Sequence, residues 1–528
     1  MLASLLSATL VGLEGRVIRV EVDVAPGLPG FTIVGLADAS VREARERVRG
    51  AIRNAGFVHP PRRITVNLAP ADLPKSGPSA DLAIAIGILV GSEQFTPAPG
   101  RAALIGELSL SGEVRRVPGL LPMVAALARR GIARVVVPAE ALVEARLVTD
   151  IDAVPAATLG EVVDALRSRR HRGPAARATV DLASRPLGAP APERGRCLLP
   201  QDSIEVPDLA DVRGQAEARR ALEVALAGGH GLLLLGPPGT GKTMLARTIP
   251  GLLPLLDPQA ALEATIVASA SGDGPIEGLV RRPPFRAPHH TTSYAAMVGG
   301  GPQLTPGEVT RADGGTLFLD ELAEFPRDVL EALRQPLEDG RVAIVRAGRA
   351  ATLPARFQLV AAMNPCPCGY ATPTRTEQGC RCSDATIERY QRRISGPLRD
   401  RIDLWVGMPR MPARLLVSGP EPEASSVVAA RIAAAQERQL ARPGRRLNAR
   451  LPSRALRRLA GLKPLTTARL VALAERERLS GRGTDRLLRV ARTIADLAGE
   501  DVVGIDHLEE AARWRLPAVA GPLAALAV

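Results

Sequence analysis

The segment that most constrains this chain is a glycine-rich run of eight residues, Gly236-Pro237-Pro238-Gly239-Thr240-Gly241-Lys242-Thr243. It matches the phosphate-binding pattern GxxxxGK[ST] at every fixed position, between the apolar stretch Leu232 to Leu235 and a predicted helix from Met244. Backbone N–H groups of such a loop surround phosphate oxygens, the lysine reaches the β- and γ-phosphates, and the threonine can ligate Mg²⁺. We therefore predict that all eight residues bind ATP and that Lys242 also serves hydrolysis.

A second acidic motif follows about eighty residues later, where the apolar run Gly315 to Leu319 ends in Asp320-Glu321. An apolar run that ends in two acids is also typical of a strand entering an ordinary acidic turn. Together with the glycine-rich loop, however, the pair favours a catalytic reading. We expect Asp320 to hold Mg²⁺ with Thr243, and Glu321 to orient and polarise the attacking water.

The chain is long enough for about three domains. Residues 1–168 predict a mixed α/β domain, with strands at Arg16–Val24 and Arg62–Leu68 and a helix at Val41–Asn54, whose start carries a capping box of Ser40 and Glu43. Residues 169–204 are rich in Arg, Ala, Pro and Gly and predict a linker. Strand–helix alternation over 205–410 predicts the α/β ATPase core, and 411–425 a short connector.

The last region, 426–528, predicts a helical domain. Ala, Leu and Arg recur with helical spacing, and the pattern is interrupted by Pro443-Gly444 and Gly481-Arg482-Gly483. The expected helices are Val427–Leu440, Ser453–Leu459, Thr466–Leu479 and Asp485–Leu497.

Positive charge is concentrated in the same region. From Ser425 to the end the chain has 19 Lys plus Arg and 10 Asp plus Glu, a surplus of 19 − 10 = 9 within a total net charge of +13. This favours a polyanionic partner such as DNA, although an arginine-rich solvated helix surface would have the same composition. Aromatic residues make up only 2% of the chain, so any nucleic-acid contact should involve backbone and shape rather than base stacking.

The sequence contains no membrane span, because no stretch reaches the roughly 18 apolar residues that a bilayer requires. The apolar N-terminal segment Leu2 to Leu13 also lacks the basic residues of a secretion signal. We therefore expect a cytoplasmic protein with no membrane partner.

Four of the five cysteines form two close pairs, Cys366 with Cys368 and Cys380 with Cys382, while Cys197 lies in the predicted linker. Two such pairs can converge on one tetrahedral metal ion, and in a reducing cytosol thiolates favour structural Zn²⁺ over disulfides. The alternatives are four free thiols or a redox pair, since CxC spacing is less usual than CxxC.

Two further segments are candidates for catalysis. The predicted strand Phe357–Met363 ends in Asn364, where ATPases of the AAA+ class place a polar residue near the γ-phosphate; the alternative is a strand-end cap. The arginine-dense segment from Arg393 to Leu404 could project a cation into a neighbouring subunit's nucleotide, which would require a ring or stack of subunits; the alternative is a solvated basic turn.

His289 and His290 suggest a metal or catalytic pair at first sight. Adjacent side chains in an extended loop diverge, however, and no third ligand lies nearby in sequence. We expect a structural or substrate-loop role, within a segment from about Thr265 to Gly307 that we predict to be a moving substrate contact.

Three segments resemble the magnesium-chelatase-like AAA+ proteins of the ComM/YifB family, and the similarity extends over nearly the whole chain. They are Phe285–Thr292 (FRAPHHTT), Gly307–Glu321 (GEVTRADGGTLFLDE) and Ala491–Leu497 (ARTIADL).

The resemblance implies a ring-forming, hexameric ATPase related to the magnesium-chelatase small subunit and to replicative helicases. For ComM proteins it implies branch migration of DNA during natural transformation. By motif, Arg401 resembles the arginine finger and Arg482 the second sensor on a helical lid, with Arg486 as the rival for that role. Two alternatives remain, a subunit for magnesium insertion into a porphyrin and an ATPase that remodels protein.

The N-terminal region resembles the proteolytic domain of Lon, an α+β fold of the ribosomal S5 domain 2-like type, through Leu73–Asp81 and Gly106–Val114. Ser79 corresponds to the nucleophile of that family. Met123 stands where the general-base lysine should be, and Lys75 is the only lysine of this region. Because a serine without a base is a poor nucleophile, we expect a scaffold without peptidase chemistry, in which Ser79 is a helix N-cap.

Overall fold

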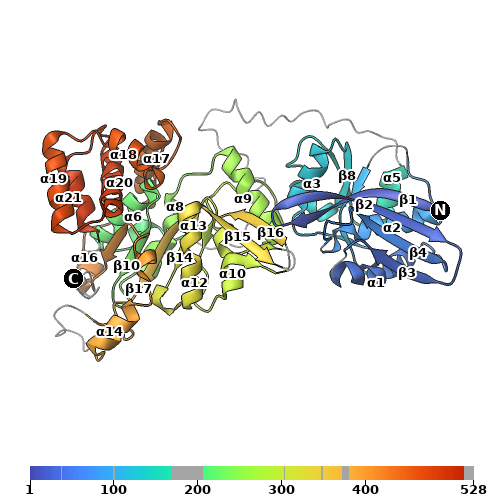
Figure 1. Cartoon of the computed structure of the whole chain (residues 1–528), viewed down its shortest axis with the longest axis horizontal. Helices are drawn as coiled ribbons and strands as arrows, with labels where there is room; N and C mark the ends of the chain where they lie inside the picture. Colours follow the sequence, from blue (N-terminus) through green and yellow to red (C-terminus); the bar gives the residue numbers. More distant parts are fainter. Residues whose placement is uncertain are drawn as a thin grey trace.

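The computed structural model describes residues 1–36, 39–75, 77–98, 102–167, 206–301, 304–346, 349–371 and 380–515. Figure 1 shows the N-terminal region (blue) at one end of an elongated molecule, the helical C-terminal region (red) at the other, and the central region with β14 and β15 between them. The predicted linker 169–204 with Cys197 lies outside the described residues, as do residues 516–528. No described helix is long and apolar enough to cross a bilayer.

A seven-stranded mixed sheet, in the order β3-β4-β2-β1-β5-β8-β9, organises the N-terminal region. The long hairpin of β1 and β2 is antiparallel and pairs Leu2 with Asp23 at one end and Val11 with Glu14 at the other. The strands are β1 (Leu2–Val11), β2 (Glu14–Ala25), β3 (Gly30–Val34), β4 (Arg63–Ala69), β5 (Ala102–Leu104), β8 (Arg134–Pro138) and β9 (Asp152–Ala156). Both strands expected from the alternation of apolar residues are present, as β2 and β4.

Five helices pack on this sheet: α1 (Ala39–Asn54), α2 (Asp81–Gly91), α3 (Leu120–Arg129), α4 (Leu142–Ala145) and α5 (Leu159–Arg167). The expected helix at Val41–Asn54 is α1, and the Ser40 side chain of its predicted capping box lies outside the described side chains. Ser79 is not the N-cap of α2. It lies within a 3₁₀ turn, Pro78–Ala80, so that Ala80 is the N-cap, and the Ser79 hydroxyl donates to the Ala8 carbonyl of β1 at 2.8 Å instead.

The central region is built on a five-stranded parallel sheet in the order β11-β14-β17-β10-β18. Runs of Leu, Val and Ala make β10, β14 and most of β17 fully buried, as expected for a parallel sheet covered on both faces. The strands are β10 (Leu232–Leu235), β11 (Phe285–Arg286), β14 (Thr316–Leu319), β17 (Gln358–Met363) and β18 (Leu404–Gly407).

Helices flank this sheet, and two small hairpins extend from it. The helices are α6 (Ala216–Gly228), α7 (Lys242–Arg247), α8 (Ile249–Leu252), α9 (Pro258–Ser271), α10 (Tyr294–Val298), α11 (Glu308–Arg311), α12 (Arg327–Ala332), α13 (Arg334–Asp339), α14 (Asp384–Gln391) and α15 (Gly396–Arg399). The hairpins pair β12 (Gly299–Gly300) with β13 (Thr305–Pro306), and β15 (Arg341–Arg346) with β16 (Arg349–Pro354).

The C-terminal region is helical, and the four expected helices are α17 (Ser425–Ala441), α18 (Ser453–Ala460), α19 (Pro464–Arg476) and α20 (Gly481–Ala498). Two helices were not expected: α16 (Ala413–Ser418), inside the predicted connector, and α21 (Ile505–Arg513). The interruption expected at Gly481-Arg482-Gly483 is wrong, because these residues form the first turn of α20. The Ser480 hydroxyl caps that turn by accepting from the Gly483 N–H at 3.1 Å, and the long apolar face of α20 offsets the low helix propensity of glycine.

A buried polar network joins the helical region to the central sheet. The His230 ring lies between the Asp403 carboxylate, at 3.3 Å, and the Thr493 hydroxyl of α20, at 2.8 Å. His230 precedes β10 and Asp403 precedes β18, so this network lies at the amino ends of the parallel strands. The helical region also packs against α6 and α8, so it covers one face of the sheet and is hydrogen-bonded to the amino ends of β10 and β18 through α20.

One ion pair in the N-terminal region offers a test of its packing. Arg47 of α1 contacts both carboxylate oxygens of the fully buried Asp81, at 2.7 and 3.1 Å. Arg47→Ala would leave this carboxylate without its ion-pair partner, and we expect a loss of about 3 kcal/mol in the free energy of unfolding, measured by urea denaturation. The control is Arg45→Ala. Because the pair of Arg45 with Glu46 is exposed, this substitution should lower the free energy of unfolding by less than about 0.5 kcal/mol.

The same loss should depend on pH. Burial raises the pKa of Asp81 to about 6 although Arg47 opposes the rise, so the folded chain holds this proton more tightly than the unfolded chain, whose carboxyl has a pKa near 3.9. Lowering the pH through 6 neutralises the buried carboxyl, and the penalty for Arg47→Ala should be smaller at pH 5 than at pH 8. An equal loss at both values would contradict this reading.

Candidate functional site

Three loops meet at the carboxyl edge of the parallel sheet. The glycine-rich loop follows β10, Asp320-Glu321 follows β14, and Asn364 follows β17, which lies between those two strands. Leu235 pairs with Met363, so β10 and β17 end together, and Leu319 pairs with Ala361, so β14 ends two residues earlier and Glu321 follows it at the height of these ends. The structure therefore brings together residues that are more than a hundred positions apart in the sequence.

Lys242 lies at the centre of this arrangement. Its ammonium donates to the carbonyls of Gly236, at 2.7 Å, and Pro237, at 2.8 Å, and to Oδ1 of Asn364 at 3.2 Å. The residue is 8% exposed, and burial lowers the pKa of Lys242 to about 8 even though Asp320 and Glu321 act in the other direction. A buried cation whose hydrogen-bond partners are all neutral is suited to receive an anionic ligand such as a polyphosphate.

The backbone of the loop fits such a ligand. Gly239 and Gly241 have φ of +78° and +90°, and a Cβ at either position would project into open space in a conformation that side chains rarely adopt. The hydroxyl of Thr240 donates to the Pro237 carbonyl at 3.0 Å and holds the turn. The loop then enters α7 with its N–H groups free of helical partners, as in a phosphate cradle.

Thr243 and Asp320 are in direct contact. The Thr243 hydroxyl lies 2.6 Å from Oδ2 of Asp320, so one hydroxyl and one carboxylate converge from two loops. Hard oxygen ligands of this kind suit Mg²⁺, which keeps several waters and takes the rest of its ligands from one or two side chains and the substrate phosphates. The residues expected to hold magnesium are thus compatible with that role.

Glu321 has an unusual backbone and an unexpected partner. Its φ is +53°, a left-handed conformation that is uncommon for residues other than glycine and that is often found at functional sites. Its Oε2 lies 3.0 Å from Nδ1 of His290. Sequence reasoning missed this contact, although β11 could have indicated it, because the strand that precedes the histidines pairs with the strand that precedes Glu321.

The two histidines do not diverge as expected. The ring centroids of His289 and His290 are 4.1 Å apart, because a tight turn in which the Thr292 N–H donates to the His289 carbonyl folds the segment back. Among the described residues, the cysteine cluster is the group of three or more potential ligands that converges closely enough to hold a metal ion.

The candidate arginines gather at the amino ends of the parallel strands, whereas the glycine-rich loop lies at their carboxyl ends. Arg401, which precedes β18, is largely buried, forms an ion pair with Glu338 and donates to the Pro397 carbonyl at 3.0 Å. Burial lowers its pKa, and the nearby cations Arg486, Arg334 and Arg482 lower it further. The structure thus brings Arg401 together with both second-sensor candidates, and separates all three from the glycine-rich loop of the same chain by the length of the strands.

Arg486 and Arg482 differ in their surroundings. Arg486 lies 3.5 Å from Asp400 and 3.7 Å from Asp403, inside the network that docks the helical region. Arg482 is exposed in the first turn of α20. The geometry therefore favours a structural role for Arg486 and leaves Arg482 accessible to a partner.

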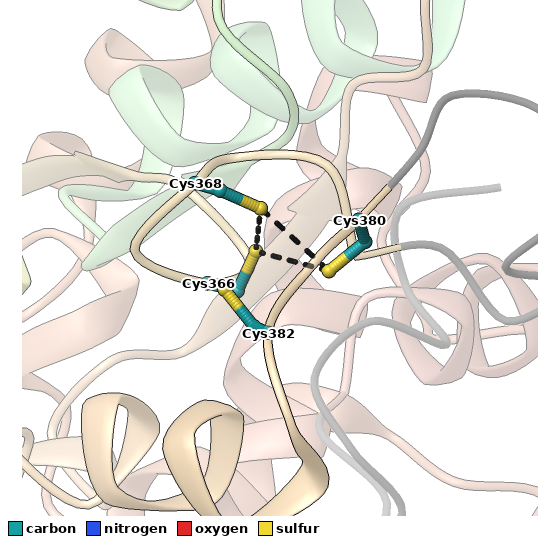
Figure 2. A group of neighbouring side chains, drawn as sticks. All are labelled: Cys366, Cys368, Cys380 and Cys382. Atoms are coloured by element: carbon teal, nitrogen blue, oxygen red, sulfur yellow. Dashed lines mark hydrogen bonds between the residues drawn. The ribbon is translucent and has the colours of Figure 1, made fainter.

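The four cysteines converge as expected (Figure 2). The sulfur atoms of Cys366, Cys368 and Cys380 are 3.3, 3.6 and 3.9 Å apart, and the sulfur of Cys382 lies within 4.8 Å of each of them. A tetrahedral Zn²⁺ with bonds of about 2.3 Å would separate its sulfur ligands by about 3.8 Å. Although burial raises the pKa of Cys368, hydrogen bonds from the Tyr370 backbone and the neighbouring thiols lower it to about 6. The cluster can hold a metal ion.

The segment that carries the cysteine cluster is in contact with the glycine-rich loop. Gly369, at φ +87°, packs so closely that a Cβ there would lie 2.5 Å from Cδ of Pro238. Asn364, which contacts Lys242, precedes Cys366 by two residues. A metal held by the four thiols would therefore brace the loop that carries Asn364 and the outer side of the glycine-rich loop.

Comparison with known protein families gives three matches along the chain. Residues 208–416 match the family described as magnesium chelatase, subunit ChlI; residues 20–141 match subunit ChlI of Mg-chelatase; and residues 422–515 match the magnesium chelatase subunit ChlI C-terminal family.

Full-length relatives are found as well. An uncharacterized protein of Mycobacterium tuberculosis is 46% identical over 96% of this chain and 97% of its own length. The YifB protein of Escherichia coli is 42% identical over 96% and 95%, and the competence protein ComM of Haemophilus influenzae is 42% identical over 97% of each chain.

The cysteine geometry predicts that the purified protein carries one metal ion per chain, measured by plasma mass spectrometry after dialysis. Cys380→Ser removes one of four thiolates and should lower the bound metal to less than about half. Cys197→Ser is the control, because it removes the one cysteine that lies outside the two close pairs in the sequence. A metal-free wild-type protein with normal nucleotide binding would contradict a structural metal site.

Proposed function

Because the chain belongs to the ComM/YifB family of magnesium-chelatase-like proteins, we propose that it is a cytoplasmic AAA+ ATPase that assembles as a hexameric ring and moves along branched or duplex DNA. The observation that carries the ATPase assignment is the convergence of Lys242, Asp320 and Asn364 on one edge of a parallel sheet. The DNA assignment rests on the relationship to the competence protein ComM and on the charge of the C-terminal region.

In the proposed reaction each residue has a separate task. The backbone from Gly236 to Gly241 binds the triphosphate, and the Lys242 ammonium exchanges its carbonyl partners for phosphate oxygens. Glu321 accepts a proton from the attacking water. Asn364 and Lys242 together position the γ-phosphate. Thr243 and Asp320 would hold Mg²⁺, which when bound neutralises phosphate charge.

A ring of subunits would explain why the arginines lie far from the chain's own nucleotide loop. Arg401 and Arg482 are close enough for Arg482 to lower the pKa of Arg401, so both could approach the triphosphate of a neighbouring subunit at one interface. Cations supplied in this way stabilise the charge that develops on the transferred phosphoryl group. Release of Arg401 from Glu338 would then accompany assembly.

Exposed arginines support a polyanionic partner. Arg445, Arg446, Arg454 and Arg458 are exposed between the end of α17 and the end of α18, with no acidic residue in that stretch of sequence. Such a surface would bind DNA through its phosphates and would therefore bind more weakly as salt increases.

For the N-terminal region we propose a Lon-like scaffold without peptidase activity. Ser79 and Met123 line the same cavity of about 290 Å³, and the Ser79 hydroxyl is bonded to a main-chain carbonyl. The Lys75 ammonium donates to the Pro70 carbonyl rather than to Ser79. No described lysine is therefore available to activate this serine.

The zinc proposal belongs with this function as a structural element. Four thiolates leave no open position for catalysis, so Zn²⁺ would stabilise the loop next to the nucleotide rather than react.

Two other functions remain open to test. A subunit for magnesium insertion into a porphyrin would share the ATPase core, but the cysteine cluster has no evident purpose there. A protein-remodelling ATPase would be favoured if protein, and not DNA, stimulated hydrolysis.

The DNA assignment predicts a substrate-dependent ATPase. At fixed, moderate salt, a four-way junction should raise the ATPase rate several-fold over the rate without DNA, and linear duplex should raise it less. Lys242→Ala is the background control, because it removes the cation that binds the phosphates and should abolish hydrolysis while the protein stays folded. Equal rates with junction, linear duplex and no DNA would move the assignment toward a protein or porphyrin-pathway client.

The ring assignment predicts complementation between two inactive variants. Arg401→Ala should be inactive alone, since it lacks the cation supplied to the neighbouring site, yet it should bind ATP at its own loop. Mixed with Lys242→Ala, it should regain part of the ATPase activity, because some interfaces would then pair an intact loop with an intact arginine. No recovery at any mixing ratio would count against action between subunits.

A further inference from the structure

The cysteine cluster is also the core of the segment that carries it. The buried residues of this small core are Cys366, Ala371 and Ile387, and the other three cysteines pack against them. Among the described residues of the core, the buried side chains that are not thiols are therefore those of Ala371 and Ile387. Two such side chains bury too little apolar surface to hold a loop by themselves. The structure of the segment therefore depends on the links among its sulfur atoms.

Two contacts connect this segment to the nucleotide site. Before the first cysteine, Oδ1 of Asn364 accepts a hydrogen bond from the Lys242 ammonium at 3.2 Å. After the second, Gly369 packs against the ring of Pro238, where a Cβ would lie 2.5 Å from Cδ. Each contact is made by a residue within two positions of a cysteine. A change at the sulfur atoms would therefore reach the lysine and the glycine-rich loop together.

The sulfur atoms are placed for oxidation as well as for metal binding. The sulfurs of Cys368 and Cys380 face each other across 3.6 Å (Figure 2), and both residues are partly exposed. All four cysteines of the cluster are free. A disulfide bond of about 2.05 Å requires these two sulfurs to approach by roughly 1.5 Å. A sulfur in a disulfide has no thiolate charge to offer a metal, so this bond would leave two of the four ligands.

We propose that the four cysteines form a redox switch, in which a peroxide joins Cys368 to Cys380, expels the metal ion and slows ATP hydrolysis. This inference rests on the proposed function, since it presupposes the ATPase and its structural metal. With two ligands lost, the segment loses the brace that holds Asn364 against Lys242 and supports the glycine-rich loop. The cysteines act through these contacts and take no part in the hydrolysis itself.

The reaction balances with the peroxide as the oxidant. The Cys368 thiolate attacks one peroxide oxygen, the O–O bond breaks, and a sulfenic acid and hydroxide form. The Cys380 thiolate then attacks the Cys368 sulfur, the S–S bond forms, the S–O bond breaks, and a second hydroxide leaves. The two thiolates together lose two electrons, which the peroxide gains, and the metal leaves as the divalent ion. Dithiothreitol reverses the reaction by thiol–disulfide exchange, and added Zn²⁺ can then bind again.

The test uses the full-length wild type, purified in reduced form. Hydrogen peroxide is added and then removed with catalase, the disulfide is located by mass spectrometry of peptides, and released metal is measured with a chromogenic chelator. The ATPase rate at saturating Mg–ATP is measured before and after. Because a hydrogen bond to the buried lysine is lost and the glycine-rich loop loses its support, the rate should fall about tenfold. Dithiothreitol with Zn²⁺ should restore it to within about twofold.

Two variants separate the switch from general oxidative damage. Cys197→Ser removes the cysteine outside the two close pairs, so its rate should fall and recover as in wild type. Cys368→Ser removes the thiolate that attacks the peroxide, so peroxide should change the rate of this variant by less than about twofold, whatever its starting rate. Recovery of the wild type with dithiothreitol also excludes methionine oxidation, whose reversal needs an enzyme.

The outcomes distinguish this inference from the proposed function. Release of metal with an unchanged ATPase rate, or a fall in the rate that dithiothreitol and Zn²⁺ do not reverse, would overturn the switch and leave the ATPase in place. A protein that is purified without metal, yet loses and regains its rate with the disulfide, would support the disulfide switch and reject the metal. If the reduced protein hydrolyses no ATP, the proposed function and the switch both fail.

Discussion

The position of β17 between β10 and β14 is the constraint on which the rest of the site depends. The three strands are parallel and buried, so their carboxyl ends must lie at one edge, and backbone hydrogen bonding fixes their relative height. A shift of one residue in β17 would turn Asn364 to the other face of the sheet and away from Lys242. The geometry of the candidate site is therefore a consequence of strand register, and the loops supply its functional groups.

Lys242 shows how the site is prepared for its ligand. Its ammonium is buried among carbonyl and amide oxygens, with its pKa lowered to about 8, while the nearest acids, Asp320 and Glu321, are engaged with Thr243 and His290. Buried charge without a charged partner is costly, so a triphosphate gains interaction energy here that a neutral ligand does not. Selectivity for an anionic ligand follows from this arrangement before any contact to a base or sugar is considered.

The two edges of the central sheet have different characters. The carboxyl edge carries the glycine-rich loop, the acids and, packed against them through Gly369, the cysteine cluster. The amino edge carries Arg401, Arg482 and Arg486, next to the buried network that docks the helical region. In the proposed ring, the amino edge of one subunit would face the carboxyl edge of the next, and the helical region would transmit its position to the arginines through α20.

The sequence alone determined the elements whose signals are local. The pattern of residues 236–243 predicts a phosphate loop because its glycines and lysine act within one turn, and the period of apolar residues located β2, β4, α1 and most of the C-terminal helices. It also indicated that the four cysteines converge, because each pair is close in sequence. Two predictions from local preference were wrong. Ser79 bonds to the carbonyl of Ala8 in a neighbouring strand instead of capping a helix. Gly481-Arg482-Gly483 are helical because the apolar face of α20 is packed.

Tertiary structure decided the features that depend on which strands are neighbours. The contact of His290 with Glu321 arises because β11 pairs with β14. Arg401 is separated from the glycine-rich loop because it precedes β18, and α20, which carries Arg482, is bonded to the same end of the sheet through His230. Residues that are far apart in the chain have no spacing signal, and long-range pairing is selected by burial of the whole sheet rather than by any single motif.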